Sequence, residues 1–181
     1  MNTGWIPAGI SALTLLLAGC SGSSDGSGNC NAITGGATQV DAPGSCTGCT
    51  ATNPHLAIDG NTVSAATLVI ETAGSGTMHL RAIAQDGVVY AAGTRLSVFA
   101  ESVFDGEATS HTVELRTYLD GVATGDSRQL TGINGVRGGG LDRDQYFLET
   151  TSAFDAAELA HTQSTSTGDI TYQIYEFCTG D

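Results

Sequence analysis

Hydrophobic and polar residues alternate in short runs from residue 66 onward. In the run from Val113 to Leu119, the odd-numbered residues are apolar or Thr, whereas the even-numbered ones are Glu114, Arg116 and Tyr118. A period of two residues is typical of a half-buried β-strand. Asp120-Gly121 follows directly and has the composition of a two-residue hairpin turn. The pattern therefore predicts an antiparallel strand pair at this point.

Similar runs, separated by Gly, Asp and Ser, predict further strands. They cover Ala66–Glu71, Thr77–Ala84, Arg95–Glu101, Gln145–Thr150, Ala157–His161 and Ile170–Phe177. No long apolar stripe has the helical period, although Ala153 to Ala160 has the composition for one or two helical turns. About eight short strands with frequent turn signals predict an all-β fold, either an antiparallel β-sandwich or jelly roll.

The amino-terminal segment has a different pattern. An uncharged apolar run from Ile10 to Ala18 closes with Leu17-Ala18-Gly19-Cys20, and it is too short to span a membrane. This ending resembles the lipobox of bacterial lipoproteins, which implies cleavage before Cys20 and lipid on its thiol. Ser21 occupies the position after the cysteine, where an Asp often retains lipoproteins at the inner membrane. The resemblance therefore implies an outer membrane protein facing the periplasm or the cell surface. An ordinary secretory signal is the alternative.

We therefore expect three parts: a signal peptide (1–19), the lipidated Cys20 with a flexible tether (20–45), and a β-sandwich domain (46–181). Residues 21–29 are almost entirely Gly and Ser, as in flexible linkers. Residues 30–52 contain few large apolar side chains, which predicts an irregular entry segment.

The net charge of −13, with six Arg and no Lys, gives an acidic surface. Such a surface repels phosphate backbones, which argues against nucleic acid as a partner.

Four cysteines remain besides Cys20: Cys30, Cys46, Cys49 and Cys178. In an exported chain, an even number of thiols indicates disulfides. Three pairings are possible, and we expect Cys178 to join Cys46 or Cys49. Cys46 and Cys49 have the spacing found in redox and zinc sites, but the sequence has no second pair with this spacing to complete a set of zinc ligands.

Four segments, in order, resemble the discoidin-like, galactose-binding-type β-sandwich family, closest to a bacterial cell-surface subgroup. They are Asn53-Pro54-His55-Leu56-Ala57-Ile58-Asp59-Gly60-Asn61 with Ala66-Thr67-Leu68 soon after, Ala92-Gly93-Thr94-Arg95, Leu115-Arg116-Thr117-Tyr118-Leu119-Asp120-Gly121-Val122, and Ala153-Phe154-Asp155-Ala156-Ala157-Glu158-Leu159. The resemblance runs from about Cys46 to Cys178. It implies a jelly roll that binds a ligand and does not catalyse a reaction.

The resemblance also implies a structural Ca²⁺ near the Asp-Gly loop. Carried over by position, the ligands would be a carboxylate oxygen of Asp59, backbone oxygens of Ala57 and Asn61, the hydroxyl of Ser64, and a carboxylate of Glu176 or Asp169. Calcium takes six to eight oxygen ligands. The simpler interpretation is that Asp59-Gly60 only makes a turn.

For the ligand site, the loop from Gly132 to Asp144 is the candidate, with Arg137, Asp142 and Arg143 as its recognition residues. The chain has no Gly-x-Ser-x-Gly, His-Glu-x-x-His or phosphate-loop motif, so we expect no catalysis. The main hypothesis is binding or adhesion to a glycan or another surface ligand. The alternative is a structural or assembly subunit whose partner is an envelope protein.

Overall fold

The computed structural model describes residues 30–104, 111–131, 141–164 and 167–180. Within these ranges the chain is all-β, which confirms the predicted fold class. The strands are β1 (Asn31–Ala32), β2 (Gly35–Thr52), β3 (Ala66–Ala84), β4 (Arg95–Phe104), β5 (His111–Leu119), β6 (Val122–Thr131), β7 (Asp144–Glu149), β8 (Ala156–Gln163) and β9 (Ile170–Thr179). A short 3₁₀ helix, η1, covers Pro54–Ile58. No helix in the described ranges is long and apolar enough to cross a membrane.

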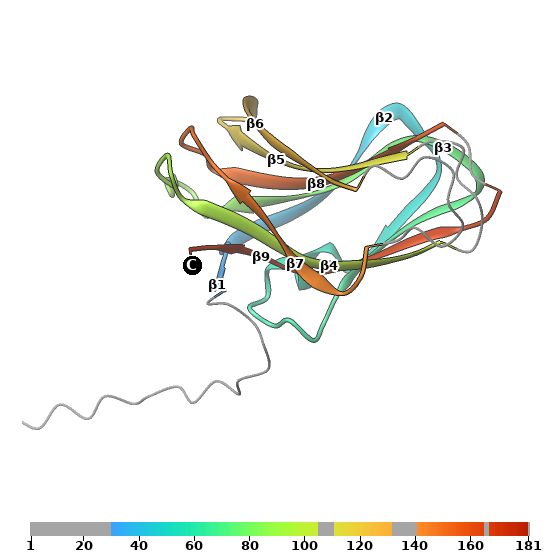
Figure 1. Ribbon diagram of the computed structural model, residues 1–181, viewed down its shortest axis with the longest axis horizontal. Coiled ribbons are helices and arrows are strands. Elements are labelled where there is room, and N and C mark those ends of the chain that lie inside the picture. Colours follow the sequence, from blue (N-terminus) through green and yellow to red (C-terminus); the bar gives the residue numbers. More distant parts are fainter. Residues whose placement is uncertain (1–29, 105–110, 132–140, 165–166, 181) are drawn as a thin grey trace, which may run out of the picture.

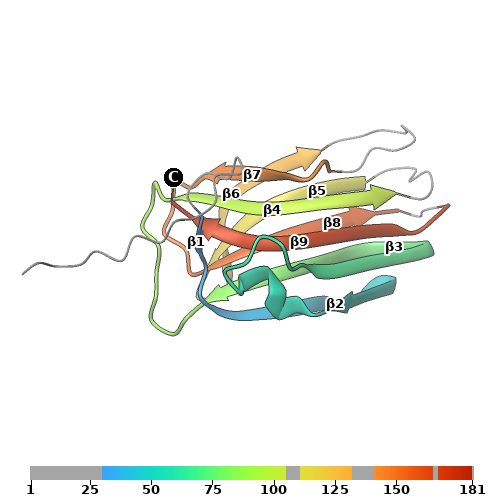
Figure 2. The same ribbon diagram turned by 90° about the horizontal axis from the view of Figure 1, so that it is seen from below.

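The strands form an antiparallel sheet in the order β6-β5-β8-β3-β9-β4-β7 that folds over into two layers (Figure 1). The bend lies in β3, because its second half pairs with β8 and its first half with β9. We call the layer of β6, β5, β8 and the second half of β3 the β8 layer. The layer of the first half of β3, β9, β4 and β7 is the β9 layer. Figure 2 shows the η1 segment lying over the outside of the β9 layer, where it contacts β2, β3 and β9.

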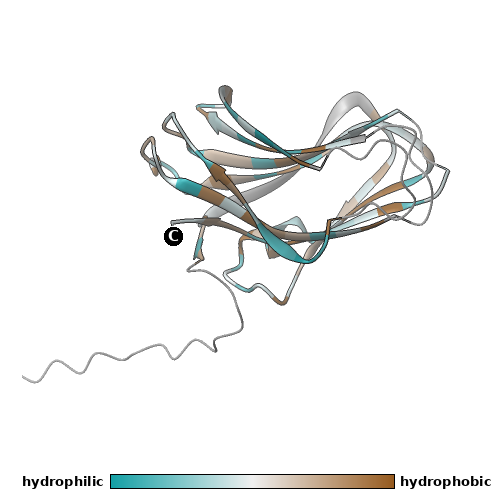
Figure 3. Cartoon of the chain, in the orientation of Figure 1, coloured by the Kyte–Doolittle hydropathy of each residue, from teal (hydrophilic) through white to brown (hydrophobic). Residues whose placement is uncertain are grey.

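The core lies between the two layers. Leu80 and Leu115 from the β8 layer and Leu96, Ile174 and Phe177 from the β9 layer are fully buried members of one cluster. Apolar and polar positions alternate along the strands (Figure 3), so each strand contributes one face to the core. Full burial of an aliphatic or aromatic side chain of this size stabilises the fold by about 1.5–3 kcal/mol.

The predicted hairpin is present. Leu119 pairs with Val122 across Asp120 and Gly121, and both turn residues have positive φ, 51° and 77°. Positive φ at both central positions defines the turn whose twist matches paired strands. The expected alternation in β5 is confirmed as well, since Val113, Leu115 and Thr117 are all fully buried.

Two expectations about local structure were wrong. Residues 35–52, which we expected to be irregular, form the long strand β2 along β3. Ala153 to Ala160 contains no helix, because most of it belongs to β8. Strand pairing therefore begins at Asn31, ahead of position 46.

The disulfides also differ from the expected pairing. Cys178 is bonded to Cys30, and Cys46 is bonded to Cys49. β1 lies antiparallel to the end of β9, with Ala32 opposite Cys178, and this pairing brings Cys30 to the last strand. The bond therefore joins the two ends of the described domain.

Candidate functional site

The loop after η1 has a fixed conformation that is built around Asp59. The carboxylate of Asp59 accepts hydrogen bonds from the backbone N–H of Asn61 at 2.9 Å and from the hydroxyl of Ser64 at 2.7 Å. The Ser64 hydroxyl also lies 3.3 Å from the backbone oxygen of Asn61. Gly60 has a φ of 77°, which a glycine adopts without steric cost. The chain therefore reverses direction at the Asp-Gly pair, a geometry that both the turn and the calcium interpretations share.

Glu176 joins this loop from the other end of the chain. Its Oε2 accepts hydrogen bonds from the backbone N–H groups of Gly60 at 2.8 Å and Asn61 at 3.1 Å. Glu176 faces the loop because β9 contains a bulge. Phe99 pairs with Glu176 while Ala100 pairs with Ile174, so one extra residue in β9 turns the glutamate away from the core side.

The surroundings of Glu176 disfavour its negative charge. The residue is fully buried, and its Oε1 has no hydrogen-bond partner. Burial raises the pKa of Glu176 to about 7, helped by the nearby charge of Asp59 and opposed by the two backbone hydrogen bonds. An unpartnered buried carboxylate oxygen beside a second carboxylate fits a cation.

The residues expected from the family resemblance are brought together only in part. Asp59, Asn61, Ser64 and Glu176 form one cluster. Asp169 is elsewhere, where its carboxylate accepts hydrogen bonds from the N–H and hydroxyl of Thr72. Among the described residues, no group of three or more His, Cys, Asp or Glu side chains is placed to hold a metal.

With two carboxylates, the remaining oxygens of a calcium shell would come from backbone groups and water. Ala57 belongs to η1 and is fully buried, so its contribution would be limited to its backbone.

Two of the candidate recognition residues, Asp142 and Arg143, make contacts within the domain. The guanidinium of Arg143 donates to the backbone oxygen of Thr62 at 3.1 Å and lies 4.4 Å from the ring centre of Tyr175. The backbone oxygen of Asp142 accepts a hydrogen bond from the hydroxyl of Tyr146 at 2.7 Å. These contacts tie the segment to the β9 layer and to the loop at Asp59. Arg137 lies outside the described residues, as does Cys20.

A second cluster, which the sequence did not single out, covers the outer face of the β8 layer. Arg81, Glu158 and Arg116 are directly opposite one another on β3, β8 and β5. Arg81 donates two hydrogen bonds to Oε2 of Glu158, at 2.9 and 2.6 Å. The hydroxyl of Tyr118 donates to Oε1 of Glu158 at 2.9 Å.

The ring of Tyr118 and the Arg81 guanidinium stack at 3.7 Å. Burial raises the pKa of Tyr118, and the charge of Glu158 raises it further. The phenol is therefore held as the neutral hydrogen-bond donor. We call Arg81, Glu114, Arg116, Tyr118 and Glu158 the β8-face cluster.

Arg116 extends this cluster toward the sheet edge. Its Nε and Nη2 donate to Oε2 of Glu114 at 2.9 and 2.6 Å, and its Nη1 lies 3.9 Å from Oε1 of Glu158. Burial alone would raise the pKa of Glu114, but hydrogen bonds from Arg116 and Ser127 outweigh it, so the pKa lies below its ordinary value. Glu114 is therefore ionised near neutral pH.

A hollow of about 260 Å³ lies beside Arg116, lined by Glu114, Arg116, Thr117, Tyr118, Ala123, Gly125, Asp126 and Ser127. It forms where β6 bulges away from β5. Arg116 pairs with Ser127 and Tyr118 with Ala123, so three residues of β6 lie opposite one residue of β5. Gly125 sits in this bulge with a φ of 91°.

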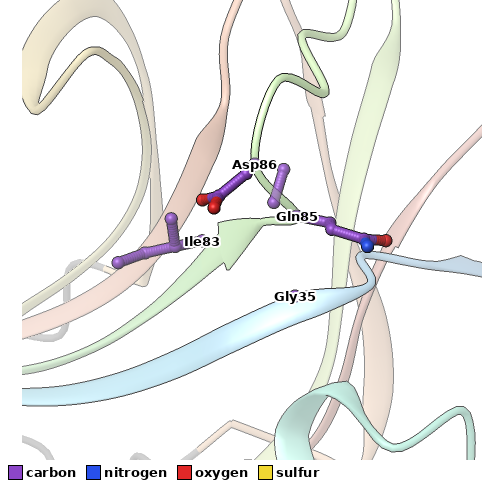
Figure 4. A pocket seen from close by; sticks show the side chains of 5 residues that line it. Gly35, Ile83, Gln85 and Asp86 are labelled. Carbon is purple, nitrogen blue, oxygen red and sulfur yellow. The ribbon is translucent and has the colours of Figure 1, made fainter.

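A larger hollow of about 530 Å³ lies where β2 begins and β3 ends (Figure 4). Its lining is Gly35, Ile83, Ala84, Gln85 and Asp86, and the side chain of Gln85 extends away from those of Ile83 and Asp86. Its polar side chains are Gln85 and Asp86, and they extend in different directions, so they do not converge on one ligand group.

No protein-family model and no curated protein sequence matches the chain. Solved structures do match, and the three that follow align with more than three quarters of this chain. The arabinose-bound α-L-arabinofuranosidase MgGH51 is 9% identical, with a TM-score of 0.50, over 79% of this chain and 23% of its own. The chain thus spans less than a quarter of that enzyme.

Carbohydrate-binding modules are also among the similar structures. One, from the β-sandwich superfamily, is 14% identical, with a TM-score of 0.44, over 81% of this chain and 58% of its own. The second module of carbohydrate-binding family 16 is 14% identical, with a TM-score of 0.39, over 78% of this chain and 89% of its own. At these identities and TM-scores, the likeness adds nothing to the β-sandwich fold that the strand pairing already shows.

Proposed function

We propose that the protein is a non-enzymatic, lipid-anchored surface protein that binds a glycan through the outer face of its β8 layer. The observation that carries this proposal is the β8-face cluster. A carboxylate that is 2% exposed, Glu158, lies on the outer side of a sheet, where side chains are ordinarily solvated. Burying a charge is costly unless it is paired and hydrogen-bonded, and here two arginines and a tyrosine surround it.

This arrangement fixes polar groups in place beside a hollow. Glu158 holds Tyr118 by a direct hydrogen bond and attracts Arg116 from 3.9 Å, so both side chains are oriented before any ligand arrives. A concave site with a few well-placed polar groups is typical of small-molecule recognition. Fixing those groups in advance lowers the entropy lost on binding.

A glycan array tests the proposal, probed with the full-length chain purified in detergent. Arg116→Ala should reduce the signal of bound glycans at least tenfold. Arg95→Ala is the matched control, because Arg95 also pairs with a glutamate, Glu149 at 3.1 Å, but on β4 in the other layer. Absence of any glycan signal, or equal loss in both variants, would contradict the proposal.

Lipid anchoring rests on the resemblance of residues 17–20 to a lipobox. Metabolic labelling with a radioactive fatty acid should mark the wild-type chain and leave Cys20→Ala unlabelled. Labelling of both proteins, or of neither, would argue against the anchor.

The loop at Asp59 is proposed as a structural calcium site. Support comes from the unpartnered Oε1 of Glu176 and the neighbouring Asp59 carboxylate. When bound, calcium would supply positive charge between the two carboxylates. Asp59 and Glu176 would hold the ion, and Ser64 orients Asp59 through its hydroxyl.

A further inference from the structure

Building on the proposed glycan-binding function, we infer that the hollow beside β5 takes an uncharged sugar ring, held through two neighbouring hydroxyl groups by the Glu114–Arg116 pair. Both side chains of this pair are accessible to a ligand. The side chains of Arg116 and Glu114 are 34% and 27% exposed, whereas that of Glu158 is 2% exposed. The first two can therefore touch a ligand, while Glu158 is a positioning residue.

A guanidinium only donates hydrogen bonds and an ionised carboxylate only accepts them, whereas a hydroxyl does both. Nη2 of Arg116 donates to Oε2 of Glu114 at 2.6 Å, so the other N–H groups of the guanidinium and the second oxygen of the carboxylate lie side by side for a ligand. Two adjacent hydroxyls match this pair, because one can accept from the guanidinium and the other can donate to the carboxylate. Charge-assisted hydrogen bonds of this kind are about twice as strong as neutral ones.

The charges around the hollow do not favour an anion. In the β8-face cluster, the two arginines are balanced by the two glutamates with which they pair. The hollow is also lined by Asp126, and hydrogen bonds from Thr151 and Ser152 lower the pKa of this carboxyl despite the opposing effect of desolvation. The whole chain carries a net charge of −13. The site thus offers no net attraction for an anion, so uronic or sialic acids are excluded as its ligands.

The hollow is small, and hydrogen bonds hold the bulge that forms it. A volume of about 260 Å³ lies below the range of roughly 300–1,000 Å³ typical of drug-sized ligands, which suits one sugar ring. The carboxylate of Asp126 accepts hydrogen bonds from the N–H and hydroxyl of Thr151 and from the N–H of Ser152, at 2.6 to 2.9 Å. The bulge that forms the hollow is therefore tied to the segment after β7.

The test compares neutral and acidic glycans of matched backbone on one array, using the full-length chain. Wild type should bind neutral glycans only, and deoxy analogues lacking one of the two hydroxyls should lose at least tenfold in affinity. Glu114→Gln removes one of the three carboxylates around the two arginines, so it should weaken neutral glycans at least tenfold and raise the signal on uronate-bearing ones above that of wild type. Arg116→Lys keeps the charge but loses the planar pair of donors, and it should show the same loss for neutral glycans without a gain for acidic ones.

Three outcomes distinguish this inference from the proposed function on which it rests. Arg116-dependent binding of acidic glycans by wild type would overturn the inference and leave the proposed function standing. If neutral glycans still bind after each of the two substitutions, and the melting temperature is unchanged, the site lies elsewhere. This result would also overturn the inference. Binding of no glycan at all would overturn both.

Discussion

Replacing Glu176 by Gln should make the calcium-free protein more stable at alkaline pH. Gln resembles the protonated carboxyl, and it can still accept the hydrogen bonds from Gly60 and Asn61. The pKa of Glu176 is raised from 4.5 to about 7 in the folded protein. At 1.36 kcal/mol per pKa unit, this corresponds to about 3 kcal/mol.

The sign of the effect follows from proton binding. Between pH 4.5 and about 7, the folded state holds a proton that the unfolded state has released, so stability falls as the pH rises through this window. Above pH 7 the wild-type protein bears the whole cost of a buried charge. The variant avoids this cost, and its advantage should shrink toward zero near pH 4.5.

The assay is urea unfolding in the presence of a chelator, at intervals from pH 5 to 8, for wild type and variant. Asp169→Asn is the matched control, because it also removes a carboxylate that accepts hydrogen bonds from a neighbouring residue, Thr72, but outside the loop at Asp59. A difference between wild type and Glu176→Gln that stays constant over this range would refute the reasoning.

Three further results are expected. Calcium should raise the melting temperature of wild type but not of Glu176→Gln. At a calcium concentration of a hundred times the dissociation constant, the free energy of unfolding rises by about 2.7 kcal/mol; a shift in both proteins would place the ion elsewhere. Cys30→Ala should lower the free energy of unfolding by about 5 kcal/mol in the chain-entropy model, because its bond to Cys178 spans 148 residues; denaturant titration measures this, and a loss below 1 kcal/mol would contradict the model. Tyr172→Phe should cost about 1–3 kcal/mol, because its hydroxyl is hydrogen-bonded to Nδ1 of His161 inside the core; an unchanged denaturant midpoint would show that this contact is energetically neutral.

Most strands could be predicted from the two-residue period, because one face of each packs against the core. β2 could not, since Gly35–Thr52 contains few large apolar residues and its place in the sheet depends on pairing with β3. The disulfide partner of Cys178 was missed for a related reason. The approach of Cys30 depends on β1 pairing with β9, a contact between residues 148 positions apart that local patterns do not reveal.

The candidate sites show the same limit. Family resemblance led to Asp59 and Glu176, which the structure brings to the same loop, where Glu176 accepts a hydrogen bond from the N–H of Gly60 and the charge of Asp59 raises its pKa. The alternation in β5 already assigned Glu114, Arg116 and Tyr118 to one outer face. Their meeting with Glu158 depends on the register between β5 and β8. Register is set by the whole sheet, so the sequence of either strand alone does not specify it.

The bond between Cys30 and Cys178 also determines how the domain withstands mechanical tension. A pull on the chain from its amino-terminal side reaches Cys30 first and passes through the covalent bond into β9. β9 is hydrogen-bonded to β3 on one side and β4 on the other, so force must shear it from two neighbours at once. Without the bond, the pull would pass through the two-residue β1 into β2, which pairs with β3 alone and would peel away one hydrogen bond at a time. A protein tethered at its amino terminus in flowing liquid would therefore keep its fold under forces that open an edge strand.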